Sequence, residues 1–144
     1  MKKLLLLFIL IISFSCSDSE KEIIYPGPLE IGGIYQGGII FELSGQHGYV
    51  AKMQDSGVMN WWAAMDLESN DWYVPNINQL EKMYINIGQG ADNIGDFANS
   101  SYWSSDYYGP SSSFTASMFN FANGTWSPGK NPVLNFRVRL VHSF

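Results

Sequence analysis

The spacing of apolar residues differs from one segment of this chain to the next, and each spacing predicts a different kind of secondary structure. Two short apolar runs, at residues 39–43 and 49–53, flank the turn-forming residues 45–48, which indicates a pair of β-strands. Apolar residues then recur at i, i+3, i+4 and i+7 as Leu80, Met83, Tyr84 and Ile87, which predicts a helix with one buried face.

Residues 76–87 carry the clearest helix signals. Asn76 is a favourable N-cap residue, Gln79 stands three positions later as in a capping box, and Gly88 follows the last apolar position. A shorter helix is predicted over Asn60 to Met65. Trp61 and Trp62 are adjacent there and cannot share a face, so we expect one to be buried and the other partly exposed.

The chain becomes strand-like after residue 97. Asn123-Gly124 is a strong hairpin-turn signal, with a return strand starting near Trp126. Phe136, Val138 and Leu140 alternate with Arg137 and Arg139, which predicts a final strand with one buried face. Strands, one or two short helices and more strands, joined by long loops, indicate a single α+β domain with an antiparallel sheet.

The first fifteen residues are expected to be removed. Lys2 and Lys3 precede an unbroken apolar run over residues 4–12, which is typical of a secretory signal and too short to span a bilayer. Cys16 directly after it resembles the acylated cysteine of a bacterial lipoprotein. The acidic residues that follow resemble the export tag of Bacteroidetes-type outer-membrane lipoproteins. We therefore predict a signal peptide (1–15), a lipidated tether (16–30) and one domain (31–144) at the cell surface, anchored through Cys16.

Charge excludes some partners. Without residues 1–15 the chain has six basic and thirteen acidic residues, a net charge of −7, which argues against nucleic acid as a partner. Cys16 is the only cysteine, so no disulfide forms within the chain and the domain must be held by its core.

Few residues suit catalysis or metal binding. His47 and His142 are the only histidines, and none of the common hydrolase, metalloprotease, redox or phosphate-binding motifs occurs. The acidic residues at 66–71 and 92–96 are interpreted as solvated surface acids rather than calcium ligands. We predict no catalytic residue, no metal site and no cofactor.

Residues 99–132 have the composition of a binding surface. Nineteen of these 34 residues are Ser, Asn, Tyr or Gly, which resembles an antibody paratope, where Tyr provides rigid contact area and Ser, Gly and Asn provide hydrogen bonds. Trp103, Phe119 and Phe121 are interpreted as core residues. The predicted ligand-binding residues are Asp106, Tyr107, Tyr108, Ser111, Ser112, Ser113, Phe114, Asn123 and Trp126.

Several blocks resemble the bacterial DUF1566 family. Asp71-Trp72-Tyr73-Val74-Pro75 with Gln79-Leu80 is similar to that family's "DWRLPT-x-x-EL" block, and Tyr102 to Ser105, Phe119 to Gly124 and Val138 to Val141 resemble its C-terminal half. The resemblance covers residues 31–144. It implies a C-type-lectin-like fold, related to formylglycine-generating enzymes, in which the first and last strands pair and long loops project at the opposite end. The calcium-binding triplets of true C-type lectins are absent.

Two classes of binding function stay open, and a third class, an unrecognised hydrolase, would show turnover of a ligand rather than its retention. The first is a carbohydrate-binding module, because Tyr and Trp rings stack on sugars while Asn and Ser reach hydroxyls. The alternative is an adhesin that binds a surface protein through the same face. Some proteins of this fold are targets of diversity-generating retroelements, and the Ser/Tyr/Asn-rich segment resembles such a variable region.

Overall fold

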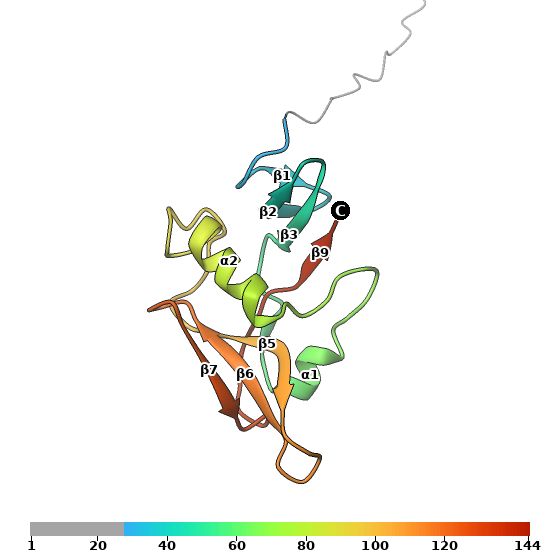
Figure 1. The fold of residues 1–144 in the computed structure, drawn as a ribbon, viewed down its shortest axis with the longest axis vertical. Coiled ribbons are helices and arrows are strands. Elements are labelled where there is room, and N and C mark those ends of the chain that lie inside the picture. The colour runs from blue at the N-terminus through green and yellow to red at the C-terminus, as the bar shows by residue number, and fades with distance from the viewer. Residues whose placement is uncertain (1–27) are drawn as a thin grey trace, which may run out of the picture.

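Two β-sheets and two helices are formed by residues 28–144, the part of the chain that the computed structural model describes (Figure 1). The predicted signal peptide, Cys16 and most of the predicted tether lie outside the described residues. The α+β class expected from the sequence is confirmed. The expected single antiparallel sheet is replaced by two sheets.

The first sheet joins the beginning of the described chain to its end. Its strand order is β1 (Ile34–Tyr35), β2 (Gly38–Ser44), β3 (His47–Lys52) and β9 (Val141–Ser143), all antiparallel. The predicted strand pair at residues 39–53 is confirmed as β2 and β3. The expected pairing of first and last strands is wrong, since β9 pairs with β3 and β1 with β2.

The second sheet has the order β4 (Gly57–Met59), β8 (Phe136–Val138), β5 (Ser101–Tyr108), β6 (Thr115–Asn120) and β7 (Thr125–Lys130). β5 and β8 run parallel, and the other neighbours in this sheet are antiparallel. The loop between β5 and β6 projects at the end of the molecule far from β1 and β9 (Figure 1).

Both helices follow the sequence signals. α2 (Ile77–Ile87) has the complete Asn76–Gln79 capping box, ends at Gly88, and buries Leu80, Met83 and Ile87 as predicted. α1 (Trp61–Met65) is capped by Asn60, whose side chain accepts a hydrogen bond from the Ala63 amide at 3.0 Å. The predicted difference between its tryptophans is confirmed, because Trp61 is buried and Trp62 is exposed.

The core lies on both faces of the second sheet. Adjacent strand residues point to opposite faces, so Tyr102 faces α2 and Trp103 faces α1. The α2 side also contains Phe121, together with Ile39 and Phe41 of β2 and Ala51 of β3. The α1 side holds Trp61 and Val138. β5 is therefore a central strand that determines where both helices sit.

The predicted final strand is wrong at Arg139. The chain leaves the second sheet after Val138 and enters the first at Val141, so residues 138–141 are consecutively buried instead of alternating. Arg139 is only 1% exposed. Its burial is possible because carbonyl and carboxylate oxygens surround its guanidinium group, as described below.

Candidate functional site

Four aromatic side chains form a cluster at the end of the molecule where β5 and β6 are joined. We call Trp61, Trp62, Tyr107 and Phe114 the aromatic cluster. Phe114 stacks with Trp62 at a ring-centroid distance of 4.8 Å and with Tyr107 at 5.2 Å, each at an interplanar angle of 26°. Trp61 lies 5.0 Å from Phe114 and 5.1 Å from Trp62. The cluster therefore connects α1 to the β5–β6 hairpin.

Hydrogen bonds hold α1 in place beneath the cluster. The Trp61 indole Nε1 donates to the Ser104 carbonyl at 2.8 Å, a bond buried between α1 and β5. The Trp61 amide donates to the Pro132 carbonyl at 2.9 Å, which connects the same helix to the β7–β8 loop. Because both donors of Trp61 are used, the residue acts as a fixed base for the more exposed rings.

The outer rings are open to a ligand. Trp62 is 51% exposed and Tyr107 is 61% exposed, whereas Trp61 is 5% exposed. Exposed serines at 111–113 adjoin Phe114 in the loop. Rigid aromatic faces next to small hydroxyl groups offer contact area at low entropic cost together with hydrogen-bonding groups.

The structure brings five of the nine predicted ligand-binding residues together at this end. Tyr107 and Phe114 belong to the aromatic cluster, and Ser111, Ser112 and Ser113 are exposed in the loop beside it. The four remaining residues do not contribute to the cluster, for three different geometric reasons.

Asp106 is a structural residue in this fold. Its Oδ2 accepts a hydrogen bond from the Ile77 amide at 2.6 Å and another from the Ser104 hydroxyl at 2.7 Å. Ile77 begins α2, where amides lack partners within the helix and a carboxylate is favourable. The predicted exposure of Asp106 is therefore wrong, since the side chain is half-buried and holds α2 against β5.

Tyr108 and Trp126 are exposed, as a ligand contact requires, but they lie elsewhere. Tyr108 follows Tyr107 in β5 and so points to the opposite face of the sheet. Asn123 and Trp126 lie at the other end of the hairpin, where Trp126 pairs with Phe119. The length of β6 separates that end from Thr115 by roughly 15–20 Å, at about 3.3 Å per residue.

Trp62 is a member of the aromatic cluster that was not among the residues predicted from the sequence to bind a ligand. The sequence predicts that one tryptophan of the pair is exposed, but Phe114, on which Trp62 stacks, is more than 40 positions away along the chain. Only the docking of α1 on β5 brings them together, and no local pattern signals it. The adjacent pair Trp61-Trp62 was the available clue.

A second group of polar residues lies around Asp55, on the loop between β3 and β4. Arg139 donates from Nε to Asp55 Oδ1 at 2.7 Å, and Arg137 donates from Nη1 to Asp55 Oδ2 at 3.0 Å. Arg139 also donates to the carbonyls of Lys52 at 3.0 Å and Gly95 at 2.8 Å. Because these contacts satisfy a buried guanidinium group, Arg139 fixes two loops to the end of β8.

Tyr102 belongs to the same group and predicts a pH dependence. Burial, with a smaller contribution from the Asp55 carboxylate, raises the pKa of Tyr102 to about 12. Its hydroxyl donates to Asp55 at 3.0 Å and accepts from the Ala98 amide at 2.9 Å. Above a pH of about 10 the unfolded chain loses this proton while the folded chain keeps it, so the stabilisation is present below pH 10 and lost as pH rises toward 12.

This pH dependence is tested by comparing the free energy of unfolding of the wild-type protein with that of Tyr102→Phe, which has no ionisable hydroxyl. We expect the wild-type protein to exceed the variant in free energy of unfolding at pH 9, with a difference that shrinks between pH 10 and 12. Urea denaturation at several pH values measures it. A constant difference across that range would show that the Tyr102 proton is not held by the fold.

The histidines and acidic residues of the described chain form no metal site. Within residues 28–144, no three His, Cys, Asp or Glu side chains are grouped as a metal site would need. Over the same residues, the helices are too short or too polar to span a membrane. His142 Nε2 lies 3.0 Å from Gln36 Oε1 and its Nδ1 lies 3.2 Å from the Asp71 carbonyl, so both ring nitrogens have partners.

Comparison with known proteins adds no relative. The chain matches no model of a known protein family, and a search of curated proteins finds no match to it.

Proposed function

We propose that the domain is a non-catalytic carbohydrate-binding module and that the aromatic cluster is its binding site. The observation that carries the proposal is the exposure of Trp62 and Tyr107 on a base of Phe114 and buried Trp61. A sugar ring has apolar C–H faces and polar edges. The exposed aromatic rings can stack on the apolar faces of the sugar, and the hydroxyls of residues 111–113 can hydrogen-bond to its polar edges.

The setting of the module is part of the same proposal. A lipid on Cys16 would hold the domain at the outer membrane surface through the tether, and the DUF1566 resemblance with its C-type-lectin-like fold remains our prediction for residues 31–144. The position of the β5–β6 loop far from β1 and β9 supports this arrangement, because it would direct the aromatic cluster away from the membrane (Figure 1).

A protein ligand is the second candidate, and one observation favours it. The Pro132 carbonyl accepts from the Trp61 amide, which places the β7–β8 loop beside α1. Val133, in that loop, is 63% exposed, and Leu134 is exposed as well. An apolar flank of this kind extends the contact area in a way that suits an adhesin partner. Sequence variation between strains at residues 99–132, as in a target of a diversity-generating retroelement, would be compatible with either a sugar or a protein ligand.

The proposal predicts that Trp62→Ala and Tyr107→Ala each abolish retention of a sugar class on a glycan array while the melting temperature stays within a few degrees of wild type. Both side chains are largely exposed, so truncation removes ligand contact area and little of the core. Tyr108→Ala is the matched control, because Tyr108 is exposed on the opposite face of β5.

Two results would contradict the proposal. One is equal retention by all three variants, which would place the sugar elsewhere. The other is an array on which the folded wild-type protein retains nothing. In that case, capture of a surface protein that Val133→Ser and Leu134→Ser weaken would support the adhesin candidate.

A further inference from the structure

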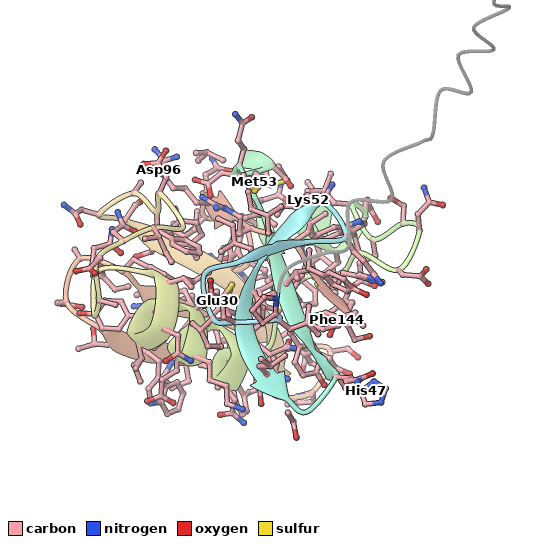
Figure 2. All side chains as sticks on the ribbon, turned by 90° about the horizontal axis from the view of Figure 1, so that it is seen from above. Glu30, His47, Lys52, Met53, Asp96 and Phe144 are labelled. Atoms are coloured by element: carbon pink, nitrogen blue, oxygen red, sulfur yellow. The ribbon has the colours of Figure 1, made fainter. Side chains whose placement is uncertain are left out.

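Two cavities adjoin the Asp55 group, away from the aromatic cluster. The first has a volume of about 500 Å³ and the second about 410 Å³. Met53, Gln54 and Asp55 line both, so the cavities meet along this segment of the β3–β4 loop. Lys52, Met53 and Asp96 lie together on the side of the molecule away from α2 (Figure 2). Both volumes fall in the range of small-molecule sites.

Basic residues concentrate at these cavities. Of the five basic residues in the part of the chain that the structure describes, Lys52, Arg137 and Arg139 line the two cavities. The same part of the chain contains ten acidic residues, but only Asp55 and Asp96 line the cavities. Three basic minus two acidic residues give the combined lining a net charge of +1 on an acidic protein. Such a region can recognise an anionic group that the rest of the surface would repel.

Lys52 is available to a ligand. Its ammonium group lies 5.3 Å from the centroid of the Trp72 ring, a cation–π contact that positions the charge at the wall of the first cavity. Among the ion pairs formed by the described residues, Lys52 takes part in none. Its charge is therefore held in place but not neutralised by a carboxylate.

Arg137 offers donors in the second cavity. Only its Nη1 bonds to Asp55 among the described residues, and its side chain is 37% exposed. Arg139, by contrast, donates its hydrogen bonds to Asp55 and to backbone carbonyls. It therefore positions the loops around the cavities and is not available to a ligand. Asp96 is the exposed acid on this wall, and its carboxylate would oppose an anionic ligand.

We propose that the joined cavities bind a short carboxylated saccharide, of the uronic-acid class. Lys52 and Arg137 would each donate a charge-assisted hydrogen bond to a ligand carboxylate. Trp72 and Met53 supply apolar surface for the sugar ring, and the amides of Gln36 and Gln54 supply partners for hydroxyls. The inference is independent of the aromatic cluster, which shares no residue with either cavity.

The first experiment titrates the full-length protein with trigalacturonate and with its methyl ester by isothermal titration calorimetry. The ester keeps the rings and removes the charges. We expect binding of the acid, at least tenfold weaker binding of the ester, and weaker binding of the acid as salt is raised. Equal affinity for acid and ester, or no binding of the acid, would overturn the proposal.

Variants then locate the site. Lys52→Gln and Arg137→Gln should each weaken trigalacturonate binding about tenfold or more, whereas Asp96→Asn should strengthen it. Lys130→Gln makes the same change in net charge on β7, outside both cavities, and should leave the affinity within about twofold. Equal losses in Lys52→Gln and Lys130→Gln would show a nonspecific charge effect and reject the site.

The two binding proposals can fail separately. Lys52→Gln should leave retention of the sugar class that binds the aromatic cluster unchanged, and Trp62→Ala should leave trigalacturonate binding unchanged. Loss of both ligands in either variant, with an unchanged melting temperature, would mean that the two surfaces form one site and would contradict their independence.

Discussion

Arg139→Leu is expected to lower the free energy of unfolding by about 3–5 kcal/mol, because it leaves buried polar groups without their partner. Asp55 would keep only Tyr102 and Arg137, and the carbonyls of Lys52 and Gly95 would lose their guanidinium donor. Arg139 is 1% exposed, so water cannot replace these contacts without opening the structure. Chemical denaturation measures the change.

Arg137→Leu is the matched control. Arg137 contacts the same carboxylate, but its side chain is 37% exposed and solvent can replace the lost bond. An ion pair of this kind contributes about 1 kcal/mol or less. Equal destabilisation by the two substitutions would show that the loops at residues 52–55 and 95–96 do not depend on the buried guanidinium group.

Phe121→Ala is expected to cost about 3–5 kcal/mol, the usual range for removing a fully buried phenylalanine. The Phe121 ring lies 4.6 Å from Phe97 and 4.7 Å from Tyr102, measured between centroids, and it also packs against Phe119 and Tyr84. Its truncation would leave a cavity between α2 and the second sheet, which the surrounding rings can fill only in part.

Trp126→Ala makes a larger truncation in the same Ser- and Asn-rich segment. Trp126 is 52% exposed on β7, the edge strand of its sheet, and we expect a change within about 0.5 kcal/mol. Thermal or chemical denaturation of both variants tests the contrast. A Trp126→Ala variant as unstable as Phe121→Ala would show that the exposed aromatic residues of this segment are structural after all.

Features determined by neighbouring residues were predictable from the sequence. The capping box and apolar stripe of α2 depend on residues within eleven positions of one another, and all of them are in place. The turn at Asn123-Gly124 is formed as expected, with Gly124 at a φ of 70°. The interpretation of Phe119 and Phe121 as core residues is also confirmed.

Features that depend on distant partners were not predictable. Alternation in residues 136–140 suggests one strand, but Arg139 is buried by Asp55, 84 positions earlier, and the chain changes sheets beside it. The residues gathered at the candidate site were only partly predictable for the same reason. Composition indicated the β5–β6 loop, but the docking of α1 is what places Trp62 beside Phe114. The pairing of β6 with β7 places Trp126 opposite Phe119, away from that loop.

We propose that the exposed rings of the aromatic cluster hold a sugar. The decisive measurement is calorimetric titration of wild type, Trp62→Ala and Trp126→Ala with the glycan best retained on the array. We predict at least tenfold weaker binding for Trp62→Ala, about 1.4 kcal/mol or more, and wild-type affinity for Trp126→Ala. Undiminished binding by Trp62→Ala, or a loss confined to Trp126→Ala, would contradict the assignment of the site.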